Sequence, residues 1–205
     1  MEVVMRGEAI EFGETGGSVM IQASGLAVLR SLGLVEECFR HGQSSPYICW
    51  SKINGSEPIV LNVTNKKADE HDLRMQAPLQ ILRSKLHTIL MHACHKVGIK
   101  TLVGKKLVDV KQDGAFVTAT FADGSTATAD LLIGADGIHS ITRRKVFGEH
   151  LTANFVGETG HIGVVNVKDH NIVLKDTDAC AFFVDRDKKY MVGTYRVSEI
   201  LAHFE

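Results

Sequence analysis

DLLIGADGIHSITRR, residues 130–144, is the stretch that says most about how this chain folds and what it binds. The apolar run DLLI predicts a buried strand, GADG predicts a tight turn, and Ser140 predicts the start of a helix. Gly134 and Gly137 would let the backbone approach a ligand, and the new helix would present free N–H groups. Asp136 can accept a hydrogen bond from a hydroxyl or orient a neighbouring arginine. A tight turn capped by Ser140, with no ligand, explains the same residues.

The same stretch resembles the Asp-Gly motif of the FAD-dependent aromatic monooxygenases, the group of para-hydroxybenzoate and salicylate hydroxylases. That motif runs acidic residue, apolar pair, small residues, Asp-Gly, two positions, Ser, two positions, Arg, and every position is matched here. Two upstream segments also resemble the family in the right order: the glycine pair and helix of GETGGSVMIQASGLAVLRSLGL (13–34), and the Arg-x-x-Leu-His helix of ILRSKLHTILMHA (81–93). The resemblance covers about residues 3–150.

The resemblance implies an α/β fold. Residues 1–148 are expected to form a Rossmann-like FAD-binding domain with a β-meander, incomplete at its N-terminal side. After Phe147 the sequence becomes strand-like with no long helical pattern, so residues 149–205 are expected to begin an antiparallel, substrate-binding sheet.

The resemblance also implies FAD as the cofactor, reduced by NAD(P)H, and the hydroxylation or epoxidation of a small aromatic or secondary-metabolite substrate by oxygen. Arg83 would reach the flavin phosphates or ribitol, and Gly17 would let the backbone pass the flavin. Asp136 with Gly137 would support the pyrophosphate region, and Arg143 or the arginine after it would help to bind the nicotinamide nucleotide. Arginine suits these roles because its planar fork binds phosphate bidentately and keeps its charge. In the plain alternative, Arg83 is a surface helix residue.

Several departures from the family keep other functions open. No strand ending in G-x-G-x-x-G opens this chain, and Met5 precedes Arg6 where the family has the glutamate that holds the adenosine ribose. Ile162 stands where the family often has an arginine, so we expect a substrate to be bound without that cation. Without the central strand, neighbouring strand edges would be exposed and tight FAD binding weakened. The alternatives are an inactive truncated relative or gene fragment, and an NAD(P)H-linked flavin oxidoreductase that does not hydroxylate.

Composition excludes several other classes of protein. The 205 residues carry 23 Lys+Arg against 24 Asp+Glu, for a net charge of -1, so neither nucleic acid nor anionic lipid is expected as a partner. No window approaches 18 consecutive apolar residues, and the N-terminus has acidic residues where a signal peptide needs an apolar stretch, which predicts a cytoplasmic chain. The four cysteines at 38, 49, 94 and 180 are single, which predicts buried thiols and no metal site. The oligomeric state and the catalytic residues are not readable from the sequence.

The periodicity of apolar residues predicts the order of the elements. Residues 23–41 read as two helices separated at Gly33, residues 43–75 as a solvated loop, and residues 79–97 as a long helix ended by Gly98. A meander with Asp-Gly turns follows, and further strands are expected. The strand segments are LVDVKQ (107–112), AFVTATF (115–121), STATADLLIGA (125–135), HIGVVNV (161–167), NIVLKD (171–176), ACAFFVD (179–185) and KYMVGTYRV (189–197).

Overall fold

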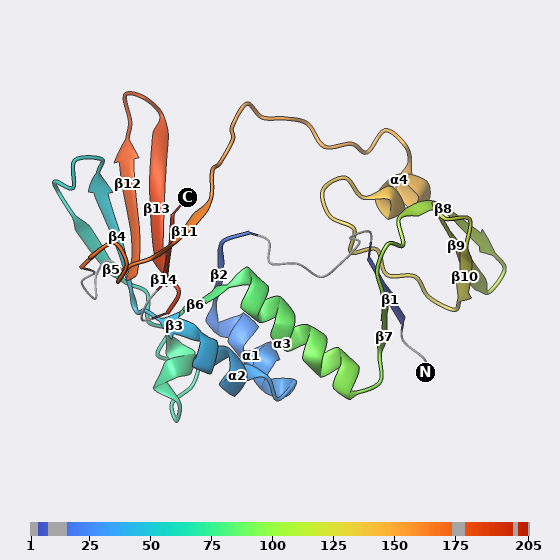
Figure 1. Cartoon of the computed structure of the whole chain (residues 1–205), viewed down its shortest axis with the longest axis horizontal. Helices are drawn as coiled ribbons and strands as arrows, with labels where there is room; N and C mark the ends of the chain where they lie inside the picture. The colour runs from blue at the N-terminus through green and yellow to red at the C-terminus, as the bar shows by residue number, and fades with distance from the viewer. Residues whose placement is uncertain (1–3, 8–15, 174–178, 199–200, 205) are drawn as a thin grey trace. The chain divides into compact units, whose positions relative to one another are not determined.

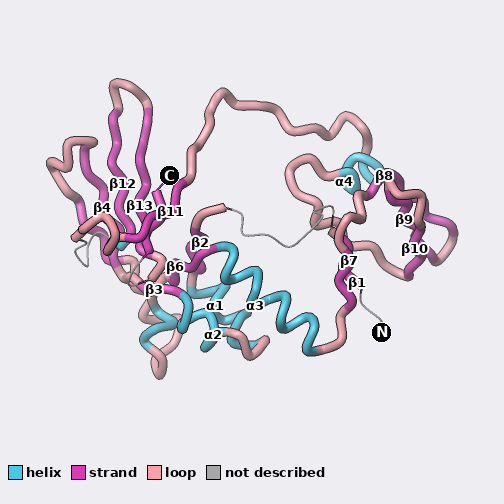
Figure 2. The backbone as a smooth tube through the Cα atoms, in the orientation of Figure 1, coloured by secondary structure: helices cyan, strands magenta, loops and turns pink. Residues whose placement is uncertain are grey.

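The computed structural model describes residues 4–7, 16–173, 179–198 and 201–204 and has the predicted mixed α/β architecture (Figures 1 and 2). The chain divides into two compact units, and each unit is assembled from two separate stretches. One unit comprises residues 1–12 and 94–159, and the other comprises residues 13–93 and 160–205. The division of the chain at residue 148 that the sequence suggested stays a prediction.

The described part of the unit of residues 1–12 and 94–159 contains two small sheets and one complete helix. Its elements are β1 (Val4–Arg6), β7 (Lys100–Leu102), β8 (Leu107–Asp113), β9 (Phe116–Phe121), β10 (Thr126–Ala129) and α4 (Ile141–Phe147). β1 pairs with β7 in parallel, and β8, β9 and β10 form the predicted antiparallel meander. Gly114 and Gly124 make its two turns with φ of +58° and +81°, which is why the Asp-Gly dipeptides predicted them correctly. α4 packs against β8.

The predicted buried strand at the start of the 130–144 stretch is wrong. β10 ends at Ala129, and residues 131–139 form neither helix nor strand. The side chains of Leu131 and Ile133 are 74% and 79% exposed. An extended segment becomes a buried strand only when a neighbour satisfies its backbone groups. Among the residues that the structure describes, no strand pairs with this segment.

The unit of residues 13–93 and 160–205 begins with helices packed on a three-stranded sheet (Figure 2). These elements are β2 (Ser18–Ile21), α1 (Ala23–Ser31), α2 (Val35–His41), β3 (Gly42–Ser44), η1 (Leu73–Gln76), β6 (Leu79–Leu82) and α3 (Arg83–Lys96). The break between α1 and α2 lies at Gly33, as predicted, with φ +72°. Leu26, Leu79 and Ile81 are fully buried and form the centre of the hydrophobic core with neighbouring residues of the helices.

The helix predicted over 79–97 begins at Arg83 instead of Leu79. Residues 79–82 form β6, the middle strand of the order β2-β6-β3, because antiparallel partners on both sides satisfy its backbone. The predicted apolar face is only partly buried: Ile89 is buried, whereas Val97 is 74% exposed. The helix ends before Gly98, whose φ of +78° agrees with its predicted role.

A six-stranded sheet of order β11-β14-β13-β12-β4-β5 completes this unit. Its strands are β4 (Tyr47–Lys52), β5 (Ile59–Asn62), β11 (Gly163–Asn166), β12 (Cys180–Asp185), β13 (Tyr190–Arg196) and β14 (Leu201–Phe204). The antiparallel pairing of β12 with β13 matches the prediction. β12 also pairs in parallel with β4, which places Ala181 opposite Cys49.

The solvated loop predicted over 43–75 is therefore wrong, since it contains β4, β5 and most of β3. Pro46 and Pro58 stand immediately before β4 and β5, where a missing N–H is tolerated. The strand predicted over 171–176 falls partly outside the described residues, and residues 171–173 form no strand.

The described residues also answer two questions raised by composition. None of the helices in these ranges combines the length and apolar character needed to cross a membrane. Three of the four thiols are buried as predicted, and Cys94 is only partly buried. Burial raises the pKa of the Cys180 thiol to about 11, so this cysteine is a packing residue at neutral pH.

Candidate functional site

One candidate site, which we call the Arg83 corner, consists of Gly16, Gly17 and Arg83. β6 passes directly into α3 at Arg83, and the Arg83 backbone N–H donates to the Gly17 carbonyl at 2.9 Å. Gly16 has φ +84°, and a Cβ atom added there would lie 3.3 Å from both Cδ and Nη1 of Arg83. The arginine side chain therefore lies against a backbone that only glycine allows without strain. Sequence reasoning named Gly17 and missed Gly16, although both belong to the glycine pair.

The chemistry of the Arg83 corner is that of an anion site. Arg83 is exposed, and it forms no ion pair with any other residue that the structure describes. It is the first residue of a helix of 14 residues whose first turn carries no acidic side chain. The unsatisfied N–H groups and the dipole of such a helix start favour a negative charge, and the guanidinium adds a full positive charge.

A second candidate site, the Asp136 turn, comprises residues 134–143. Ser140 donates its hydroxyl hydrogen to Asp136 Oδ1, and Thr142 donates to Oδ2 through its backbone N–H at 2.9 Å and its hydroxyl at 3.1 Å. Ser140 caps α4 as predicted, because its Oγ accepts from the Arg143 N–H at 2.9 Å. The Asp136 carboxylate therefore fastens the turn to the first residues of α4.

The pKa of Asp136 reflects this network of hydrogen bonds. Partial burial acts to raise it, but the hydrogen bonds from Ser140 and Thr142 outweigh burial and hold the pKa at about 2. The carboxylate is therefore ionised throughout the physiological range. The side-chain donors to the Asp136 carboxylate are Ser140 and Thr142, so among the described residues it does not orient an arginine.

Glycine is favoured at positions 134 and 137 of the turn by two different structural constraints. Gly137 has φ +75°, and a Cβ atom there would meet nothing within 4 Å. A Cβ atom on Gly134 would lie 2.6 Å from the Thr142 methyl carbon. Gly134 is thus required by close packing against α4, not by an approaching ligand, while the open space beside Gly137 is compatible with one.

The two arginines after the turn are used differently. Arg143 donates to the carbonyl oxygens of Ile138 at 2.6 Å and of Leu151 at 3.3 Å, so its guanidinium ties together the loops before and after α4. The Nε of Arg144 is buried and has no hydrogen-bond partner. Of these two arginines, Arg144 is the one with a buried N–H donor, its Nε, that lacks a partner in the described structure.

The residues predicted for the site thus fall into two groups. Gly17 and Arg83 meet in the unit of residues 13–93 and 160–205, whereas Asp136, Gly137 and Arg143 share one turn in the other unit. The described residues contain no group of three or more histidine, cysteine or acidic side chains that could hold a metal ion.

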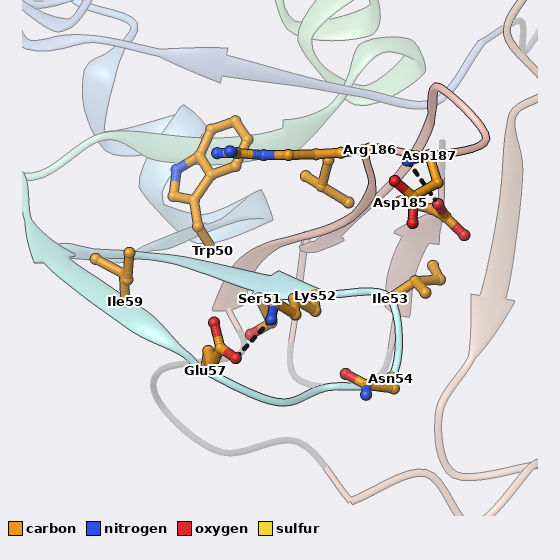
Figure 3. Close-up of a pocket in the computed structure, with 11 residues that line it drawn as sticks. Trp50, Ser51, Lys52, Ile53, Asn54, Glu57, Ile59, Asp185, Arg186 and Asp187 are labelled. Carbon is orange, nitrogen blue, oxygen red and sulfur yellow. Dashed lines mark hydrogen bonds and ion pairs between the residues drawn. The ribbon is translucent and has the colours of Figure 1, made fainter.

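A cavity of about 680 Å³ that is lined by none of these residues lies at the tips of the β4–β5 and β12–β13 hairpins (Figure 3). Trp50 forms one wall and stacks on Phe182 with ring centroids 4.5 Å apart. Arg186 points toward Trp50 (Figure 3). The lining cation Lys52 pairs with Glu57 at 2.5 Å, and Asp185 accepts two backbone N–H groups of its own turn.

A smaller cavity of about 270 Å³ lies at the opposite end of the same strands. It is lined by Gln43, Ser44, Ser45, Pro46, Tyr47, Ala179 and Arg196. The Nε of Arg196 is buried without a hydrogen-bond partner, and the same is true of Oε1 of Gln80 on the neighbouring strand β6. Sequence reasoning missed both residues, because a polar side chain on a strand carries no signal that it lacks a partner.

Comparison with known proteins identifies the family. Residues 11–203 match the family model described as FAD binding domain. An FAD-dependent urate hydroxylase of Mycolicibacterium vanbaalenii is 34% identical over 160 residues, covering 75% of this chain and 38% of that protein. 3-Hydroxybenzoate 6-hydroxylase 1 of Aquipseudomonas alcaligenes is 26% identical over 170 residues, covering 82% and 42%. The chain belongs to the FAD-binding domain family of FAD-dependent monooxygenases and spans less than half the length of these relatives.

Solved structures agree on the fold. The crystal structure of 2-methyl-3-hydroxypyridine-5-carboxylic acid oxygenase matches with a TM-score of 0.73 at 16% identity, covering 99% of this chain and 51% of that one. Klebsiella pneumoniae HpxO complexed with FAD and uric acid matches with a TM-score of 0.67 at 20% identity, covering 97% and 48%. At such identities, the likeness shows the fold alone.

Proposed function

We propose that this member of the FAD-binding domain family binds FAD through the Arg83 corner and works as a monooxygenase that uses NAD(P)H and oxygen. The substrate would be a small organic molecule, and hydroxylation or epoxidation the reaction. This extends to the chain what the names of its relatives state for proteins about twice its length. A cytoplasmic location is part of the same proposal.

The observation that carries the proposal is the exposed guanidinium of Arg83, packed on Gly16 at the start of α3. A flavin phosphate is doubly suited to this place, because Arg83 can bind it bidentately and the free N–H groups of the helix start can add further hydrogen bonds. Gly16 presents no side chain, which lets the Arg83 side chain lie against the backbone at the place where the phosphate would bind. The residues present therefore fit the anionic part of FAD.

Bound FAD would supply electron transfer from a reduced nicotinamide and oxygen transfer to the substrate. The protein's own residues would bind and orient. In the proposal, Asp136 supports the pyrophosphate region indirectly, because its carboxylate fixes the turn from which the Gly137 backbone is presented. Arg143 or Arg144 would bind the nicotinamide nucleotide, Arg143 through the part of its guanidinium that does not donate to Ile138 and Leu151.

The test is a titration of the purified chain with FAD, following flavin fluorescence and the visible spectrum. Loss of the charge-assisted hydrogen bonds of Arg83 is worth about 1.5–3 kcal/mol, so Arg83→Ala is expected to weaken FAD binding about 10- to 100-fold. Arg186→Ala, which removes an exposed arginine from the hairpin tip, is the matched control and should leave the affinity unchanged. A folded chain that does not bind FAD, or equal affinities for both variants, would contradict the proposal.

Turnover separates the remaining alternatives. A monooxygenase consumes oxygen and NAD(P)H and forms an oxygenated product, whereas a non-hydroxylating oxidoreductase oxidises NAD(P)H without such a product. Labelled oxygen in the product, measured by mass spectrometry, would support the monooxygenase. Oxidation of NAD(P)H with no label in any product would support the oxidoreductase.

A further inference from the structure

We propose that two copies of this chain associate through the outer edge of β5, which we call the β5 edge, by antiparallel pairing of β5 with β5 about a two-fold axis. β5 is the last strand of the six-stranded sheet, and among the described strands it pairs only with β4. The inference goes beyond the proposed function, because it concerns the assembly of the chain and not its flavin or substrate.

The β5 edge has the features of a strand that accepts a partner. All four residues of β5 are exposed, and the apolar side chains of Ile59, Val60 and Leu61 are 61%, 46% and 48% exposed. Edge strands that stay unpaired are usually protected by a lysine, a proline or a bulge. The sequence IVLN of β5 contains neither residue, and its register with β4 is continuous. Such an edge is a template for another strand.

The hydrogen bonds between β4 and β5 show which backbone groups of β5 remain available. The Val63 N–H donates at 2.8 Å to the carbonyl of the residue before β4. Hydrogen-bonded positions alternate in an antiparallel pair, so Leu61 and Ile59 also bond toward β4. The N–H and C=O groups of Val60 and Asn62 therefore point outward. Among the described residues, no backbone group bonds to them.

These outward groups are self-complementary in one antiparallel register. When Val60 of one copy lies opposite Asn62 of the second copy, the two residues exchange both of their hydrogen bonds, and the two-fold axis repeats the exchange. Leu61 then lies on the axis, opposite Leu61 of the second copy. Ile59 lies opposite Val63 of the second copy, so apolar side chains face apolar side chains across the new pair.

Other arrangements of the two strands are less favourable. A shift that sets Val60 opposite Val60 of the second copy would set Asn62 opposite Pro58, which has no N–H to donate. Charge favours the antiparallel direction: the acidic end of β5, with Glu57, approaches the basic end of the second copy, with the exposed lysines at 66 and 67. Parallel pairing would bring like charges together. A second copy of this chain is therefore the partner that the edge fits.

Sedimentation velocity of the purified 205-residue chain over a series of concentrations tests the inference. A pair of short strands buries less than the roughly 1,200 Å² of a standard interface, so we expect a reversible monomer–dimer equilibrium. Val60→Lys should weaken the dimer at least about tenfold, because it places a hydrated charge on the pairing edge. Circular dichroism and a thermal melt of each variant show whether it is folded.

The opposite edge of the same sheet supplies the matched control. Val164 lies on β11 and is 45% exposed, nearly the same as Val60. Val164→Lys is therefore the same substitution at a similarly exposed valine of the other edge strand. It should leave the dimer unchanged.

A cross-linking experiment tests the register. Opposed residues of a non-hydrogen-bonded pair have Cα atoms about 4.5 Å apart, which a disulfide can span. Leu61→Cys, incubated with oxidised glutathione as the oxidant, should therefore give a disulfide-linked dimer on a non-reducing gel. Ile59→Cys is the control and should not cross-link, because Ile59 lies opposite Val63 of the second copy. The unsubstituted chain, treated in the same way, shows the contribution of the four native cysteines.

Any of three results would overturn the inference. The first is a folded chain that stays monomeric up to about 1 mM. The second is equal weakening of the dimer by Val60→Lys and Val164→Lys, and the third is equal cross-linking of Leu61→Cys and Ile59→Cys. None of these measurements uses FAD, so their failure is distinct from failure of the flavin proposal.

Discussion

At the Arg83 corner the guanidinium has no ion-pair partner among the described residues, whereas at the Asp136 turn the charged side chains named by the sequence already bind their own loop. Both regions combine glycine, a charged residue and the start of a helix. They differ in how much hydrogen-bonding capacity remains for a ligand. Residue type alone therefore does not distinguish a ligand contact from a scaffold, and the remaining capacity does.

The largest effect expected from this comparison is on the stability of the Asp136 turn. Asp136→Ala removes the acceptor of three hydrogen bonds and leaves the Thr142 N–H without its partner, so we expect a loss of about 2–3 kcal/mol in the free energy of unfolding. Arg83→Ala, at an exposed site, should change it by less than about 0.5 kcal/mol. Urea denaturation of both variants measures the difference. Equal losses of unfolding free energy in the two variants would contradict the distinction between the Asp136 turn and the Arg83 corner.

A medium effect is expected at Gly16. Gly16→Ala places a side chain at φ +84° and 3.3 Å from Arg83, so we expect a loss of about 1–2 kcal/mol of stability together with several-fold weaker FAD binding. Gly33→Ala is the matched control, because its φ of +72° imposes similar strain with no neighbour within 4 Å. It should lower stability without affecting FAD. If both variants bind FAD with equal affinity, glycine is needed at position 16 only for its backbone conformation.

The smallest expected effect is a pH dependence at the Asp136 turn. The pKa of Asp136 is held at about 2, below its ordinary value of 3.8. A carboxylate with a lowered folded-state pKa stabilises the fold above about pH 4, and this contribution is lost as the pH falls from about 4 to about 2. The stability difference between the chain and Asp136→Asn should therefore be larger at about pH 6 than at about pH 2.5. A difference independent of pH would show that the charge of Asp136 does not stabilise the turn.

The sequence predicted the elements whose determinants are local. The Asp-Gly turns of the meander, the break at Gly33 and the cap at Ser140 depend on residues within one turn of the chain, and all three are confirmed. β4 was missed because its partner β12 lies more than a hundred residues away, and β5 was missed with it because β5 pairs with β4. β6 was taken for helix because LQIL continues the apolar spacing of α3, and only pairing on both sides makes it a strand.

The candidate site was only partly predictable for a related reason. Motif resemblance located Gly17, Arg83 and Asp136, but it could not show that Arg83 keeps its donors while Arg143 gives its own to two carbonyls. The smaller cavity left no trace in the sequence, since residues 43–47, Ala179 and Arg196, which line it, are remote in the chain. Unsatisfied hydrogen-bonding capacity is a property of three-dimensional packing.

The parallel pairing of β4 with β12 also has a consequence for biosynthesis. On the ribosome, β4 is made long before its partner, because the whole of residues 94–159 must be translated between them. At roughly 5–20 residues per second, β4 waits on the order of 10 seconds before β12 exists. During that time the edge of β4 that later pairs with β12 is open, and its hairpin partner β5 carries three successive exposed apolar side chains, Ile59, Val60 and Leu61. Nascent chains at this stage are expected to depend on chaperones that cover open strand edges.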